Sequence, residues 1–250
     1  MGGICHYGQM IARPRIRPRW WKYPVLAVLA VSAIGLALLA LQPVGTDGTA
    51  PPKDLLPTIA PAPPAPTSVF LGGSTTAGVG VSGRANRWST ELAAAKGWQE
   101  ISLATKGGDI IFGVAPRTCG PSPCPSYQEL VAQTVGLNPS VVVLAAERGS
   151  TNENSPDAAA TTNAALAALR VGLPDATLIV VGPAALTGMI DTRAVDLDSA
   201  VRAAAARVGA TYVSLLEPNV LDPSMVASDG VSVNEAGHAA IAVRVKTALS

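Results

Sequence analysis

Short apolar runs alternate with longer helix-forming stretches over residues 67–250 of this 250-residue chain. The run Val141–Ala146 has no polar residue, which is typical of a strand buried on both faces of a sheet. We expect strands at Ser68–Leu71, Glu100–Ala104, Val141–Ala146, Thr177–Val181 and Thr211–Leu215. We expect helices at Trp88–Lys96, Tyr127–Val135, Pro156–Val171, Asp198–Val208 and Asn234–Leu249. Alternation of this kind predicts an α/β fold: a three-layer αβα sandwich around a five-stranded, mainly parallel sheet with right-handed crossovers.

The N-terminal quarter has a different composition. Residues 1–23 are basic, and Val25–Leu41 then runs for 17 residues without a charge. As a helix this run would span about 26 Å, close to the thickness of the hydrocarbon core of a bilayer. We therefore expect a transmembrane signal-anchor helix at 24–42, with 1–23 in the cytoplasm and the C-terminal part outside the cell membrane. A cleaved secretory signal is the alternative, but the run is long for one and lacks a small-x-small site at its end.

The segment that follows the apolar run has the composition of a linker. Residues 43–66 include eight prolines, which favour polyproline II over helix or sheet. We expect residues 67–250 to form one domain beyond this linker. The domain has more acidic than basic side chains, which argues against a nucleic-acid partner.

The three cysteines fit the same organisation. Outside the cytoplasm Cys119 and Cys124 are expected to form a small disulfide loop, whereas Cys5 precedes the apolar run and is expected to stay reduced. A zinc site would need further ligands, and none lie near this pair in the sequence. We expect neither a metal nor a cofactor.

Two segments carry candidate chemistry. Gly72-Gly73-Ser74 follows the first predicted strand, and such a turn leaves a serine accessible. The closing segment reads Asp229-Gly230-Val231-Ser232-Val233-Asn234-Glu235-Ala236-Gly237-His238. Together they resemble the first and last blocks of the SGNH (GDSL-type) hydrolase family, whose fold is an αβα sandwich of flavodoxin-like type. The resemblance covers nearly all of residues 67–250.

The resemblance implies roles for individual residues. Ser74 would be the nucleophile and its N–H one oxyanion donor, although Gly73 stands in the slot of the family's aspartate. Gly108 would donate a second N–H, with Gly107 as the alternative. The Asn152 side chain would be the third donor, with Asn154 as the alternative. Each of these segments also has a simpler interpretation as a turn or a loop that ends a strand.

The position of the general base is the main departure from the family. Asp229 matches the acid of a serine triad, but Ser232 stands where the family has its catalytic histidine. His238 is a candidate base, although the family has a histidine there beside its catalytic one, which indicates a packing or capping role. Lys106 is a second candidate, as part of a Ser–Lys pair.

Three functions are therefore open at this stage. The first is a membrane-anchored, extracytoplasmic ester hydrolase or acyl transferase of reduced activity, acting on acyl or acetyl esters of envelope lipids or glycans. The second is a catalytically inactive relative that binds an envelope glycan or protein in the same cleft. The third is a structural accessory of a membrane assembly, with the proline-rich segment setting its reach.

Overall fold

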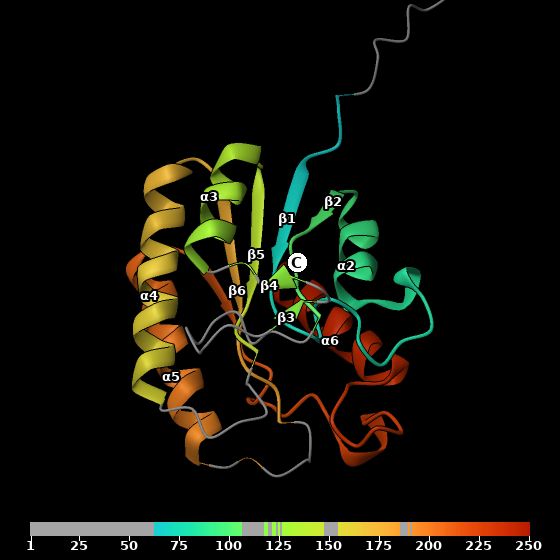
Figure 1. Ribbon diagram of the computed structural model, residues 1–250. Coiled ribbons are helices and arrows are strands. Elements are labelled where there is room, and N and C mark those ends of the chain that lie inside the picture. Colours follow the sequence, from blue (N-terminus) through green and yellow to red (C-terminus); the bar gives the residue numbers. More distant parts are fainter. Residues whose placement is uncertain are drawn as a thin grey trace, which may run out of the picture. The chain divides into compact units, whose positions relative to one another are not determined.

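A five-stranded parallel sheet lies at the centre of the domain (Figure 1). The computed structural model describes residues 63–106, 118–119, 122–123, 125, 127–147, 155–185, 190 and 192–250. The strand order is β2-β1-β5-β6-β7. The strands are β1 (Thr67–Leu71), β2 (Gln99–Ser102), β5 (Val141–Ala145), β6 (Thr177–Val181) and β7 (Thr211–Val213).

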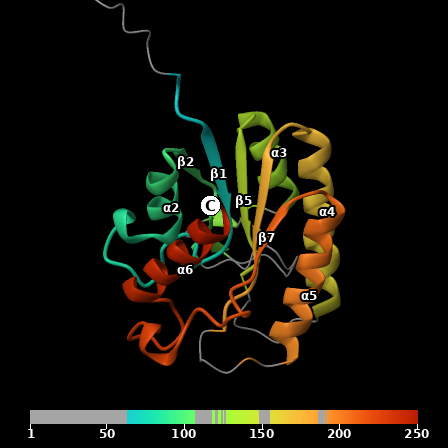
Figure 2. The same ribbon diagram turned by 180° about the vertical axis from the view of Figure 1, so that it is seen from behind.

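Helices cover both faces of this sheet, as Figures 1 and 2 show from opposite sides. One face packs against α2 (Trp88–Lys96) and α6 (Glu235–Ala248). The other face packs against α3 (Tyr127–Leu137), α4 (Ser155–Gly172) and α5 (Thr192–Arg207). Successive residues of β1 alternate between the two cores: Val69 and Leu71 belong to one, Phe70 to the other. The predicted three-layer αβα sandwich is confirmed.

The strand order places a topological switch point between β1 and β5. The chain leaves β1 toward β2 on one side, and β5 pairs with β1 on the other. Ligands of open α/β sheets bind beyond the carboxyl ends of the strands at such a point. Ser74 follows β1 and Glu147 follows β5, so both lie at this position.

Several predicted boundaries were wrong; a local backbone conformation explains one of them and tertiary contacts explain another. Helix α3 continues through Gly136 because Asn138, at φ 45°, takes the left-handed position that ends it. Helix α5 begins at Thr192 rather than Asp198. Asp198 lies inside the helix because its carboxylate accepts hydrogen bonds from Tyr212 (2.5 Å) and Ser214 (2.9 Å) on the neighbouring strand segment.

Smaller shifts occur at other element ends. Strand β2 runs from Gln99 to Ser102 rather than to Ala104, and β7 ends at Val213 rather than Leu215. Beyond β2, however, Leu103 N–H donates to the Phe70 carbonyl (2.9 Å), so the chain stays beside β1. Helix α4 begins at Ser155, one residue before the predicted start.

Some predicted features lie outside the described residues. These are the basic N-terminus 1–23, the anchor helix 24–42, most of the linker 43–66, and Cys124. A short antiparallel pair not predicted from the sequence, β3 (Thr118–Cys119) with β4 (Ser122–Pro123), places Cys119 opposite Ser122. Among the helices of the described residues, none has the length and apolar character needed to cross a bilayer.

Candidate active site

Ser74 lies in a tight turn that directly follows β1. The Gly73 carbonyl accepts from Ala77 N–H (2.9 Å) and the Ser74 carbonyl from Val79 N–H (2.9 Å). Gly78 closes this turn at φ 80°, a conformation that side-chain-bearing residues rarely adopt. Ser74 itself is half-buried. The sequence thus placed Ser74 correctly, at the end of the first strand and in a turn.

The turn is held by a carboxylate that the sequence analysis did not assign. Glu147 accepts from the backbone N–H of Thr75 through Oε2 (2.8 Å) and of Thr76 through Oε1 (2.6 Å). A Cβ on Gly72 would overlap Thr76 Oγ1 and lie 3.0 Å from Glu147 Oε1, so the backbone must be bare there. Hydrogen bonds from N–H to a carboxylate are about twice as strong as neutral ones. Glu147 therefore fixes the Ser74 turn, in which Gly73 stands in place of the family's aspartate.

The segment after β2 also reaches this turn. Thr105 N–H donates to the Gly72 carbonyl (3.1 Å), so residues 103–105 run alongside the start of the turn. Lys106 follows and is exposed. The proposed oxyanion donors Gly108 and Asn152, and their alternatives Gly107 and Asn154, lie outside the described residues. Their roles stay predictions.

Asp229 accepts hydrogen bonds from its own turn, mainly from Ser232. The Asp229 carboxylate accepts from the Ser232 hydroxyl (2.6 Å) and from the N–H groups of Ser232 (2.8 Å) and Val231 (2.9 Å). These hydrogen bonds, that of the hydroxyl foremost, lower the pKa of the exposed Asp229 carboxyl. Asp229 thus closes a turn around Ser232.

The same turn approaches the nucleophile segment. Gly80 packs against the backbone of Val233, and a Cβ there would overlap the Val233 carbonyl and lie 3.0 Å from Ser232 Cβ. Its φ of 97° also requires glycine. The structure therefore brings the first and closing blocks together, with Ser232 next to the end of the Ser74 turn.

His238 lies inside the protein, at the start of α6. Its side chain has no exposed surface, and Nδ1 accepts from Trp88 N–H (3.2 Å) at the first residue of α2. Nδ1 must therefore be unprotonated, which places the proton of the neutral ring on Nε2. Burial lowers the pKa of His238; the nearby Arg87 charge lowers it further, and the Val79 carbonyl offsets part of the change.

These contacts favour a structural role for His238. The residue at the N-cap of α2, Arg87, makes no side-chain cap, so the imidazole supplies the acceptor that this helix end needs. A general base must exchange protons with a substrate group, and His238 is sealed from solvent and occupied at Nδ1.

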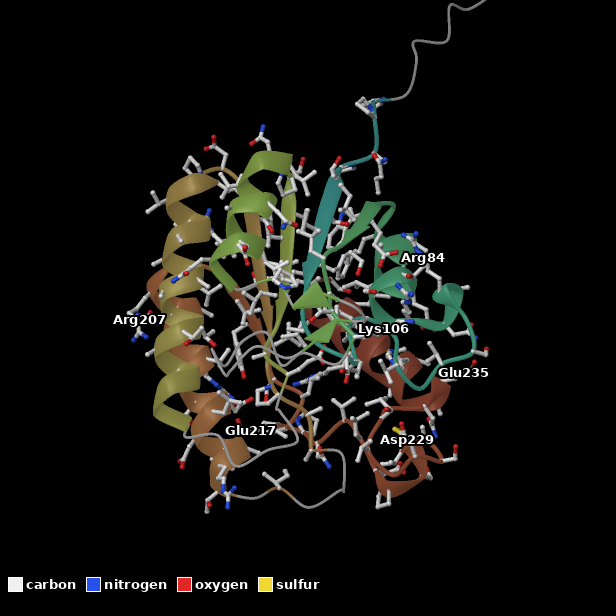
Figure 3. All side chains as sticks on the ribbon, in the orientation of Figure 1. Arg84, Lys106, Arg207, Glu217, Asp229 and Glu235 are labelled. Carbon is white, nitrogen blue, oxygen red and sulfur yellow. The ribbon has the colours of Figure 1, made fainter. Side chains whose placement is uncertain are left out.

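Neighbouring residues of the closing block hold the loop that follows the Ser74 turn. Asn234, the first residue of the predicted helix, is the N-cap of α6 and accepts from Gly237 N–H (3.1 Å). Glu235 accepts from Ser82 N–H (3.2 Å) and from the Asn86 amide (2.8 Å), both in the loop before α2. Figure 3 shows Glu235 at the right-hand side of the domain, near α6, and Asp229 below it. The described residues include no group of three or more His, Cys, Asp or Glu side chains placed to hold a metal ion.

Comparison with solved structures identifies the architecture. One match, a structure of TesA, has 18% sequence identity and a TM-score of 0.57, and covers 74% of this chain and 98% of that chain. A carbohydrate esterase family 2 enzyme from Corynascus thermopiles matches with 17% identity and a TM-score of 0.57, over 76% of this chain and 68% of its own. The domain has the SGNH hydrolase fold.

A third match has a more specific description. Est24, a carbohydrate acetylesterase from Sinorhizobium meliloti, has 12% identity and a TM-score of 0.54, over 73% of this chain and 98% of its own. No protein-family model matches the sequence, and no curated protein sequence matches it. The likeness to the SGNH hydrolases is therefore one of fold, and the activity has to be argued from the site.

Proposed function

We propose that this protein is a slow ester hydrolase or acyl transferase of SGNH type. The observation that carries the proposal is the turn at the switch point of the sheet, where Glu147 fixes the backbone on either side of Thr75 and leaves Ser74 half-buried. A serine held rigidly at the carboxyl end of a central strand is what acyl transfer requires. Esterases among the structural neighbours support this choice of chemistry.

We place the enzyme at the membrane by inference from the sequence. An anchor at 24–42 and a proline-rich linker at 43–66 would hold the domain outside the cytoplasm. Its substrates would then be acyl or acetyl esters of envelope lipids or glycans. No cofactor is needed for this chemistry.

In the proposed reaction Ser74 Oγ forms a bond to the acyl carbon, and the bond from that carbon to the alcohol oxygen breaks. The hydroxyl proton passes through water to the leaving alcohol. The N–H groups of Ser74 and Gly108 and the Asn152 amide would stabilise the oxyanion. Water or an acceptor alcohol then releases the acyl group from Ser74.

The missing base sets the rate. In a serine triad that acts as a unit, loss of the base costs of order 10⁶ in kcat. Oxyanion donors and binding still leave roughly 10³–10⁴ over the reaction in water. Ser232 cannot replace an imidazole because a neutral hydroxyl is too weak a base, even with its O–H donating a hydrogen bond to Asp229. We therefore expect turnover that is measurable but slow.

A fluorophosphonate probe tests this proposal. Covalent labelling of the full chain that disappears in Ser74→Ala would support an activated nucleophile at Ser74. Lys106→Ala and His238→Asn serve as further variants, because loss of labelling in a folded Lys106 variant would assign the base to a Ser–Lys pair. A folded protein that the probe does not label at Ser74 would rule out the hydrolase.

One observation favours a second function, that of a binding domain without turnover. Asp229 accepts hydrogen bonds from Ser232 and Val231, so with serine at 232 the acid position closes its own turn instead of orienting an imidazole. A domain of this kind would bind an envelope glycan or protein in the same cleft. It would bind acyl esters but show neither labelling nor hydrolysis.

A further inference from the structure

A pocket of about 400 Å³ lies directly beside the Ser74 turn. Three parts of the chain line it: the turn itself at Ala77, the loop before α2, and β2 with the residues that follow it. Its charged side chains are Arg84, Arg87, Glu100 and Lys106. Figure 3 shows Arg84 and Lys106 on the side of the domain formed by β2 and α2.

The carboxylate in this pocket is already neutralised. Glu100 Oε2 accepts from Arg84 (3.0 Å) and from the Thr90 hydroxyl (2.8 Å), and Oε1 accepts from the Ser89 hydroxyl (3.0 Å). The Glu100 side chain is only 6% exposed, against 62% for Arg84. Glu100 and Arg84 therefore form an ion pair, and because Arg84 neutralises the Glu100 charge, little negative potential is left in the pocket.

The other two cations differ from Arg84 in the part of the chain that the structure describes. Among the described residues, neither Arg87 nor Lys106 forms an ion pair with a carboxylate. Arg87 is half-buried and Lys106 exposed. Among the described residues that line the pocket, two positive charges are therefore in excess, within a domain that is acidic as a whole. Like-signed charges on a partly enclosed surface concentrate ligands of the opposite sign.

Arg87 is built into the nucleophile turn. Its side chain lies across Gly78, where a Cβ would come within 2.6 Å of Arg87 Cγ and 2.7 Å of Nε. Gly78 N–H in turn donates to the Thr75 carbonyl (3.0 Å). The Arg87 side chain therefore packs against the end of the turn that contains Ser74, and both Arg87 and Ala77 of that turn line the pocket.

We infer that this pocket binds an anionic group of the substrate, a carboxylate or a phosphate, close to the ester that Ser74 attacks. The inference rests on the proposed function, because it names the substrate class of the same site. Arg87 offers a planar donor fork that suits either oxyanion, and Lys106 adds a point charge at the pocket mouth. The volume of about 400 Å³ is sufficient for an acidic head group or one acidic sugar.

A matched pair of ligands tests the inference without turnover. 4-Acetoxybenzoate and its methyl ester have the same acetyl ester and differ in one carboxylate. Their affinities for the full-length Ser74→Ala chain are measured by calorimetry at low and at high salt. We expect the anionic ligand to bind about tenfold more tightly at low salt and to lose most of that advantage near 1 M salt.

Substitutions of the charged residues test which side chains cause the preference for the anionic ligand. Added to Ser74→Ala, either Arg87→Gln or Lys106→Gln should lower the preference about threefold to tenfold. Arg87→Lys keeps the charge but loses the donor fork, so it should lower the preference less than Arg87→Gln does. The control is Lys246→Gln, which removes an exposed cation from the last turn of α6, remote from the pocket lining, and should change nothing. Should Arg87→Gln unfold, Lys106→Gln decides alone, because its side chain is exposed.

The outcomes separate this inference from the proposed function. Equal binding of the two ligands, or a preference that survives in both folded glutamine variants, would overturn the anion pocket even where Ser74 is labelled. A charge-dependent preference without labelling of Ser74 would support the anion pocket and contradict the proposed hydrolase activity. Competition by O-acetylated galacturonate oligosaccharides or by short-chain phosphatidylglycerol then distinguishes an acidic glycan from an anionic lipid as the source of the group.

Discussion

Glu147 is the residue on which the shape of the nucleophile turn most depends. Glu147→Ala removes both acceptors from the N–H groups of Thr75 and Thr76, whose bonds measure 2.8 and 2.6 Å. An N–H left without a partner in a buried site costs about 1–3 kcal/mol, and partial access of water to this site reduces the sum. We therefore expect Glu147→Ala to lower the free energy of unfolding by about 2–4 kcal/mol. Glu147→Gln keeps one carbonyl acceptor and should lose about half as much.

Urea unfolding followed by tryptophan fluorescence measures this difference, because Trp88 is buried in the domain core. With a slope of about 2 kcal/mol per molar urea, the expected loss moves the midpoint of Glu147→Ala by roughly 1–2 M. Thr76→Val is the matched control: its buried hydroxyl has no hydrogen-bond partner in the described residues, so its removal should cost less than about 0.5 kcal/mol. A loss below about 1 kcal/mol in Glu147→Ala, or an equal loss in Thr76→Val, would refute the reasoning.

Three further substitutions test other parts of the site. His238→Asn should flatten the pH dependence of the urea midpoint. Burial lowers the pKa of His238, so the neutral ring contributes its full stability above pH 6.5, and this stability is lost as the pH falls through the lowered pKa. A slope between pH 6.5 and 5 as steep as in the wild type would contradict this. Ser232→His should raise kcat/KM on short acyl esters by about 10²–10⁴-fold, and an unchanged rate in folded protein would show that a base alone is not enough. Gly78→Ala should lower the melting temperature more than Gly97→Ala, because both take left-handed φ but only Gly78 touches Arg87; equal losses would show that the contact is unimportant.

The parts of the fold that the sequence predicts are those set by local pattern. Val141–Ala145 is an unbroken apolar run, and a strand flanked on both faces requires one. Asn234 begins the last helix because its side chain accepts from Gly237 N–H, three residues away. The Ser74 turn follows from small residues after a strand. In each case the deciding interaction lies within a few residues.

Features decided by distant contacts escaped prediction. Glu147 binds backbone groups 71 and 72 residues away, and no local pattern marks it as the holder of the turn. The one available signal was its position after a central strand, next to the strand that precedes Ser74. Asp198 likewise lies inside α5 because Tyr212 and Ser214 satisfy its carboxylate, whereas an acidic residue in isolation favours a helix start.

The closing block shows why most residues of a motif can match a family while the residue at its catalytic position differs. Four of its residues have structural tasks in this fold: Asn234 caps α6, Glu235 ties down the loop at Ser82, Gly237 leaves no room for a Cβ beside Val233, and His238 caps α2. Losing any one would leave a polar group unpaired or force a steric overlap.

Ser232 is different, because its side chain contacts the exposed Asp229 and the two form a self-contained turn. Folding therefore constrains residues 234–238 but leaves 232 open to substitution. Likeness in the helical part of the block is consequently evidence of fold, and only the residue at 232 informs on catalysis. On this argument an imidazole restored at 232 should act with little effect on stability, since the turn around Asp229 also rests on the N–H groups of Val231 and residue 232.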